Sequence, residues 1–205
     1  MAPPVVKVRA PMTPYRLPAC LLLFALAGCG ASGPIQRDIT PFTAEHEPAF
    51  ENGLDMVRDP EALGGAWLRT WEEDIDRRVT LADVVALVTV KTFRTDVDLE
   101  RNETYRLVTE VEREYLGELE DEIVLTVSAS EAGFGTISDN ERRILDSQFI
   151  AFIKFQEAPD GSIRARWHLS PASEPVARRV RDLLRERRDV VEDDGTRRRV
   201  IIHRN

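Results

Sequence analysis

The chain has 205 residues, of which 42% are hydrophobic and 31% charged, and its formal net charge at pH 7 is −8. A chain of this length can form one domain with flanking segments and bury enough core to fold alone. The acidic balance argues against nucleic-acid binding, which requires positive charge to displace counterions from phosphates. Two cysteines in the whole chain offer neither a disulfide framework nor a cysteine-based metal site.

The first 28 residues have the three parts of a secretory signal. A basic region without acids is followed by residues 17–26, an apolar run too short to cross a bilayer as a helix. The run ends in Leu26-Ala27-Gly28-Cys29, which resembles the lipobox of bacterial lipoproteins. The resemblance implies signal cleavage between Gly28 and Cys29 and a diacylglycerol on the Cys29 thiol. Met12 is an alternative start to Met1, because it gives a signal of more ordinary length.

The same resemblance implies a location. A lipid on Cys29, with fatty acids such as palmitate, would hold the mature chain on a membrane of the cell envelope. Gly30 stands where an inner-membrane retention signal would place Asp, which favours the outer membrane in a Gram-negative cell. Residues 29–56 begin at this cysteine, and their first part is rich in Gly, Pro, Ser and Thr. This composition predicts a flexible tether between the lipid and the domain.

The first ordered element is predicted to be a helix over residues 60–77, with Asp59 as its N-cap and Pro60 in the first turn. Apolar residues recur every four positions and would form one buried face. This predicted stripe consists of Leu63, Trp67, Trp71 and Ile75.

Five later segments alternate in polarity or are dense in β-branched residues, which is typical of strands. In the second of them, Tyr105 and Tyr115 fall on the same predicted buried face. Between the third and the fourth, Ser138 and Glu141 have the spacing of a capping box, which predicts a short helix through Leu145. The predicted strands are residues 83–93, 104–116, 122–129, 148–155 and 162–169.

A second amphipathic helix is predicted at residues 174–188, with Ser173 as its cap, before a tail at 189–205 that could form a short hairpin. The predicted class is therefore α+β: a small five-stranded antiparallel β-barrel flanked by an N-terminal and a C-terminal helix, over residues 57–188. The order of strands and short helix resembles an OB-like barrel. Such barrels bind oligonucleotides, oligosaccharides or proteins, but a fold alone does not assign a function.

One strand carries candidate binding residues. Arg164, Arg166 and His168 alternate with Ala165 and Trp167, which are predicted to face the core. We therefore expect the three bases to form an outward cationic row suited to carboxylates or phosphates. The alternative is that these bases pair with acids of the same domain.

No catalytic or metal-binding motif accompanies this row. The histidines 46, 168 and 203 lack ligand or triad spacing, and the strand acids Glu110, Glu112 and Glu114 could hold a cation but more often form a solvated face. No cofactor is expected. The sequence favours a binding or scaffold module of the envelope, whose partner would be an envelope protein or an anionic polymer. Two alternatives stay open: an envelope hydrolase using carboxylates, and a carrier of an apolar ligand, which would need an empty cavity.

Overall fold

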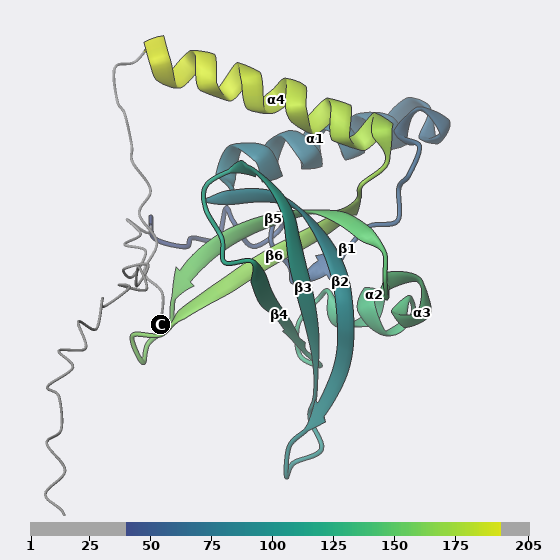
Figure 1. Ribbon diagram of the computed structural model, residues 1–205, viewed down its shortest axis with the longest axis vertical. Coiled ribbons are helices and arrows are strands. Elements are labelled where there is room, and N and C mark those ends of the chain that lie inside the picture. Colours follow the sequence, from purple (N-terminus) through teal and green to yellow (C-terminus); the bar gives the residue numbers. More distant parts are fainter. Residues whose placement is uncertain (1–39, 194–205) are drawn as a thin grey trace, which may run out of the picture. The chain divides into compact units, whose positions relative to one another are not determined.

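The computed structural model describes residues 40–193, with side chains described for residues 40–187. Within this part of the chain, a curled six-stranded sheet is combined with four α-helices and one 3-10 helix (Figure 1). The strands are β1 (Gly53–Leu54), β2 (Val84–Val97), β3 (Glu103–Leu116), β4 (Glu122–Ser128), β5 (Gln148–Glu157) and β6 (Ile163–Pro171). The helices are η1 (Pro60–Leu63), α1 (Gly65–Leu81), α2 (Phe134–Ser138), α3 (Glu141–Ile144) and α4 (Glu174–Asp193).

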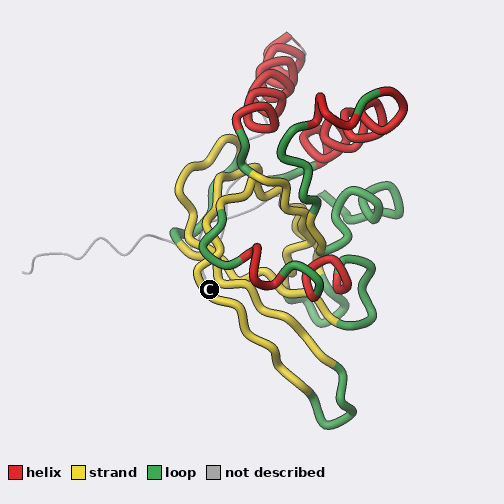
Figure 2. Tube along the Cα trace, turned by 90° about the vertical axis from the view of Figure 1, so that its right-hand side faces the viewer, coloured by secondary structure: helices red, strands yellow, loops and turns green. Residues whose placement is uncertain are grey.

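The strands lie in the order β1-β6-β5-β2-β3-β4. All neighbours are antiparallel except β1, which runs parallel to β6 and pairs Gly53 with His168. Figure 2 shows that the sheet curls into an incomplete barrel. The α+β class with a barrel-like sheet is therefore confirmed, whereas the prediction of five antiparallel strands is wrong, because β1 adds a sixth and parallel strand.

Two cores lie on opposite sides of the sheet. The concave side is filled by side chains of the strands, α2 and α3, among them the fully buried Trp167. Against the convex side pack α1 and α4 (Figure 1). Residues 149–155 of β5 are consequently buried on both faces. The predicted buried side of α4 is confirmed, and it consists of Val176, Val180, Leu183 and Leu184.

The β2–β3 hairpin is longer than the sequence pattern predicts. β2 does not end at Phe93 but continues to Val97, which pairs with Glu103. The outer half of this hairpin extends beyond the rest of the sheet (Figure 1), and residues 94–103 are exposed. We call residues 94–106 the arm. Irregular pairing of β3 with β2 near Leu116 also turns Tyr115 toward the helical core, so its predicted position beside Tyr105 is wrong.

The N-terminal helix is interrupted. Gly64 has φ 65° and ψ 159°, a conformation open almost only to glycine, and it separates η1 from α1. The predicted stripe therefore fails at its first half: Leu63 and Trp67 are exposed, and α1 begins its buried face at Trp71. That face continues through Ile75 and Val79.

The predicted capping box is also wrong. Ser138 ends α2, and its hydroxyl accepts a hydrogen bond from Tyr105 (3.4 Å) instead of capping a helix. α3 starts only after Asn140. Ser173 does precede α4, and its carbonyl accepts from the amide of Ala177, but its hydroxyl donates to the carbonyl of Arg58.

Residues 40–56 do not form a tether throughout. Phe50 and Leu54 are buried, and β1 belongs to the sheet, so the domain begins well before residue 57. Apolar side chains beside a sheet edge gain more from burial than a solvated linker does. The signal, Cys29 and the predicted hairpin of the tail lie outside the described residues. No described helix is long and apolar enough to span a membrane.

Candidate functional site

The three bases of β6 do not form one exposed row. Arg164 is exposed and lies 3.8 Å from Asp160, whereas Arg166 is half-buried and pairs with Glu131. The side chain of His168 is buried, with a residue exposure of 1%. The prediction of a joint outward row is therefore wrong, because α1 and the segment around β1 cover that face of β6.

His168 belongs instead to a buried polar cluster, formed by residues 51, 55, 78, 168 and 170. Its Nε2 lies 3.2 Å from Oδ2 of Asp55, and the hydroxyl of Ser170 donates to the same oxygen at 2.5 Å. Arg78 of α1 approaches this oxygen to 3.9 Å. Nδ1 of His168 lies 3.7 Å from Glu51. The cluster thus joins β6, α1 and both sides of β1.

The charges in this cluster are set by burial. Burial lowers the pKa of His168, and the charge of Arg78 lowers it further, against the opposing effect of Asp55. The imidazole is therefore neutral at pH 7 and can donate from Nε2. Burial alone would raise the pKa of Asp55, but the hydrogen bonds from His168, Ser170 and the amide of Val57 hold that pKa below its ordinary value.

This geometry does not suit nucleophilic catalysis. In a serine relay, the histidine lies between the serine and the acid and takes the serine proton. Here Asp55 lies between His168 and Ser170, and no hydrogen bond joins the imidazole to the hydroxyl among the described contacts. Ser170 is fully buried. The cluster can hold three segments together, but Nδ1 of His168 and Nε of Arg78 are buried without a hydrogen-bond partner.

Arg166 takes part in a second internal network. Its partner Glu131 also accepts from the side-chain amide of Asn52 at 2.7 Å. Asn52 in turn accepts from the amide of Trp167 at 3.0 Å. The guanidinium of Arg166 lies 5.7 Å from the ring centre of Phe42. Arg164 and Arg166 therefore follow the alternative stated for these bases in the sequence analysis: both pair with acids of the same domain.

One buried ion pair escaped the sequence analysis. Lys154 of β5 is 1% exposed, and its ammonium donates to Asp83 at 2.7 Å and to the hydroxyl of Thr40. Asp83 also accepts from the amide of Phe155 at 2.8 Å. A signal existed, since Lys154 interrupts an otherwise apolar strand, and a charge at such a position needs a buried partner.

The three glutamates of β3 have separate partners rather than a common ligand. Glu110 pairs with Lys91 at 3.0 Å, and Glu112 accepts from the hydroxyl of Thr89 at 2.7 Å. Glu114 accepts from a backbone amide. In the described part of the chain, no group of three or more His, Cys, Asp or Glu side chains is placed to hold a metal ion.

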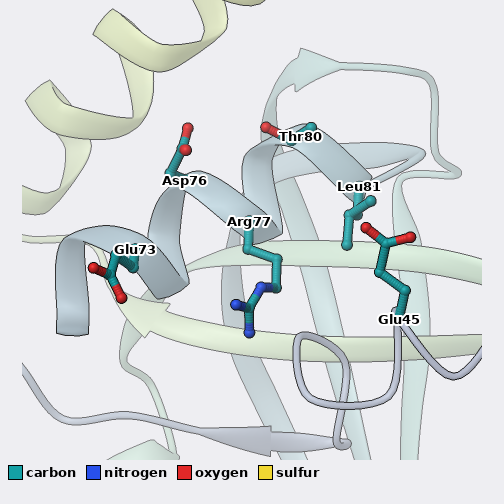
Figure 3. Close-up of a pocket in the computed structure, with 6 residues that line it drawn as sticks. All are labelled: Glu45, Glu73, Asp76, Arg77, Thr80 and Leu81. Atoms are coloured by element: carbon teal, nitrogen blue, oxygen red, sulfur yellow. The ribbon is translucent and has the colours of Figure 1, made fainter.

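Beside a hollow of about 310 Å³ between α1 and Arg179, a second open hollow of about 330 Å³ lies on α1. Figure 3 shows its lining, in which the carboxylates of Glu73, Asp76 and Glu45 point in different directions. A carboxylate pair that shares one substrate needs converging oxygens. The other lining residues are Arg77, Thr80 and Leu81.

Leu99 and Trp67 are the two most exposed large apolar side chains among the described residues. Leu99 is fully exposed at the tip of the arm. Trp67 is 76% exposed at the start of α1, although tryptophan is rarely left in water without a reason. Sequence reasoning missed both, since it placed Trp67 in the core and gave the arm no role.

Comparison with models of protein families, with curated proteins and with solved structures finds no match for this chain.

Proposed function

We propose that this protein is a lipid-anchored binding module of the bacterial cell envelope, carried on Cys29 and contacting its partner through the arm. The observation that carries the proposal is the order of elements at the N-terminus: a basic region, a short apolar run and Leu26-Ala27-Gly28-Cys29. In a Gram-negative cell, Gly30 favours the outer membrane.

The construction of the arm supports a binding role. Its two strands pair as far as Val97 and Glu103, and Arg106 bridges to Asp96 across them. Asp98 accepts hydrogen bonds from the amides of Glu100 and Asn102, both at 2.8 Å, which stabilise the turn. An arm held in this way presents Leu99 without the entropy cost of ordering a loose loop.

The chemistry of the arm favours a protein partner over an anionic polymer. Four acids, at positions 96, 98, 100 and 103, surround Leu99, against the bases Arg94, Arg101 and Arg106. A negatively charged polymer would be repelled by this acidic excess, whereas an apolar pocket with a basic rim would be complementary.

The finer comparison with an OB-like barrel is part of the proposal. β2, β3 and β4 pair in sequence order, β5 pairs with β6 and with β2, and α2 and α3 lie between β4 and β5 in the chain. Nε1 of Trp167 donates to the carbonyl of Thr126 at 3.0 Å, which links β6 to β4 where such a barrel would close. In OB-like barrels, the loops between the first two and the last two strands contact ligands. The arm occupies the first of these positions.

The other two functions gain no support from the geometry. The concave core is filled by Trp167, Phe149 and their neighbours, where a carrier of an apolar ligand would need space. The acids of the hollow on α1 do not converge on a common point, where a hydrolase would place its carboxylates (Figure 3).

The anchor is tested by intact-mass spectrometry of the membrane fraction. We expect the mature chain to begin at Cys29 with acyl additions, and Cys29→Ser to abolish both cleavage and acylation. Cys20→Ser is the matched control, because Cys20 lies in the apolar run and would leave with the signal. Unmodified wild-type protein that starts elsewhere would contradict the anchor.

The arm is tested by photocrosslinking in intact envelopes. A crosslinker at position 99 should capture a defined protein. With the crosslinker moved to position 101, Leu99→Ser should reduce capture of the same protein. Ile163→Ser is a suitable control, because Ile163 is also an exposed aliphatic residue but lies on the opposite hairpin. Equal capture in wild type, Leu99→Ser and Ile163→Ser would remove the arm from the proposal.

A further inference from the structure

The turn between η1 and α1 is an exposed apolar surface. Residues 61–67 are all exposed, and the stretch 62–68 contains no charged side chain. Trp67 and Leu63 are its two large side chains, 76% and 37% exposed. Gly64 and Gly65 both have positive φ, and a Cβ added at either position would meet nothing within 4 Å, so the surface beside the two glycines is open, while Leu68 packs against the helical core. We call residues 62–68 the apolar turn.

We infer that the apolar turn is a second membrane contact, with Trp67 inserted at the lipid–water interface of the membrane that holds the lipid of Cys29. This inference rests on the proposed lipid anchor. Tryptophan has an apolar body and a polar N–H, which is why it is enriched where hydrocarbon meets headgroups. The nearest charges along the chain, Asp59 and Glu61 against Arg58 and Arg69, cancel. The contact therefore depends on apolar area and not on anionic lipid.

The length of the chain permits both contacts on one membrane. The hydroxyl of Thr40 receives a hydrogen bond from Lys154, which also binds Asp83, two residues after the C-terminal end of α1. The apolar turn lies at the other end of α1, about 25 Å away at 1.5 Å per residue. The 11 residue steps from Cys29 to Thr40 can span at most about 40 Å. A lipid on Cys29 can thus lie in the bilayer that Trp67 touches.

Charge on α1 restricts how the domain would sit. Glu73 and Asp76 of α1 line the hollow together with Glu45 (Figure 3). These carboxylates oppose a helix lying flat on an anionic surface. The contact is therefore made by the apolar turn alone, at the N-terminal end of α1.

The test uses the intrinsic fluorescence of the mature lipidated protein in phosphatidylcholine vesicles. Of the three tryptophans, Trp71 and Trp167 are 7% and 0% exposed, so quenchers in the solvent or the lipid act mainly on the fluorescence of Trp67. We expect phosphatidylcholine brominated on its acyl chains to quench the emission, and quenching by aqueous acrylamide to fall several-fold relative to the same protein in detergent-free buffer without vesicles. Trp67→Phe should lose both effects.

A second variant keeps the reporter. Leu63→Glu places a charge in the apolar turn, and we expect it to abolish quenching by brominated lipid while the protein stays on the vesicles through Cys29. Ile163→Glu, at an exposed aliphatic residue on the β5–β6 hairpin, should behave as wild type. Circular dichroism confirms that each variant is folded.

The outcomes separate the inference from the anchor. If the protein floats with the vesicles, is still fully quenched by acrylamide and is not quenched by brominated lipid, the membrane contact is overturned and the anchor stands. Intact masses without acyl chains would refute the anchor. The membrane contact would then be tested with the unlipidated chain at a high vesicle concentration. Absence of quenching by brominated lipid in that experiment would overturn the membrane contact. Crosslinking of position 67 to an envelope protein, without bromolipid quenching, would also overturn it.

Discussion

Trp167 shows how one side chain can organise a half-open sheet. It is fully buried in the concave core, its ring N–H reaches the carbonyl of Thr126, and its amide donates to Asn52. It therefore connects β6, β4 and the segment before β1 at a single position. The alternation of β6 predicts its burial correctly, but the two polar contacts join residues 41 and 115 positions apart, which no local pattern reveals.

Replacing Trp167 should be costly. We expect Trp167→Ala to lower the free energy of unfolding by about 3 to 5 kcal/mol, since it leaves a cavity and an unpaired carbonyl. Trp167→Phe should cost less, because it keeps most of the packing and loses mainly one hydrogen bond. Urea denaturation followed by circular dichroism measures both values. An unchanged midpoint for Trp167→Ala would mean that the concave core does not depend on this ring.

His168 makes stability depend on pH. Burial and Arg78 lower its pKa from the ordinary 6.5, so in mildly acidic solution the unfolded chain binds a proton that the folded chain does not. The free energy of unfolding should therefore fall as the pH drops from about 6.5 toward the folded pKa. Asp55 contributes stability that is present above its unfolded pKa of about 3.8 and is lost only as the pH falls through its lower, folded value.

The comparison of variants isolates the histidine. Between pH 7.5 and 5.5, we expect urea midpoints of wild type to fall more than those of His168→Gln, which has no imidazole to protonate. His46→Gln is the control for the loss of a histidine elsewhere, because the His46 ring bonds to Thr43 and not to the buried polar cluster. Parallel pH profiles for wild type and His168→Gln would show that other groups cause the dependence.

At the scale of elements, two glycines allow a test of how closely the start of α2 approaches the backbone beside β1. A Cβ on Gly133 would lie 2.2 Å from the carbonyl oxygen of Asn52, whereas a Cβ on Gly135 would meet nothing within 4 Å. We expect Gly133→Ala to destabilise the protein by about 1 to 3 kcal/mol or more, as overpacking does. Gly135→Ala, inside α2, should be neutral or stabilising by up to about 1 kcal/mol. Thermal melts of the two variants that coincide would contradict this close approach.

The elements that the sequence predicts well are those whose signal is local. The alternation of β3, β4 and β6 and the apolar side of α4 need only a period and a direction. β1 has two residues, too few to show any period, and it gains its place from β6, more than a hundred residues later. The break at Gly64 had a local signal in the Gly64-Gly65 pair, but the spacing of four from Leu63 to Ile75 outweighed it.

The candidate site was predicted less well for the same reason. Arg164, Arg166 and His168 do share a face of β6, as alternation requires. Which part of that face meets water depends on α1, on the residues beside β1 and on Glu131, all distant in sequence. Solvent therefore reaches Arg164, while Arg166 and His168 are covered by segments that a pattern along one strand cannot place.

For the whole molecule, the segment before residue 57 decides whether the sheet is complete. A chain truncated to 57–188 lacks Phe50, Leu54 and the carboxylate of Asp55, and we expect it to lose cooperative unfolding, whereas a chain of residues 40–193 should keep it. Burial of two such apolar side chains is worth about 1.5 to 3 kcal/mol each, a large share of a typical stability of 5 to 15 kcal/mol. Differential scanning calorimetry compares the two. Equal melting temperatures would show that the segment merely accompanies the fold.

The path of residues 40–55 over the domain has a mechanical consequence. Pulling on the chain from its N-terminal side first loads the contact of Thr40 with Lys154 of β5 and then the pairing of β1 with β6. The segment should therefore detach before β2 separates from β3 and β5, and its loss uncovers the core that Phe50 and Leu54 help to fill. Released in this way, its 16 residues add up to about 55 Å of length. The same residues that complete the sheet at rest would detach first under load and lengthen the chain.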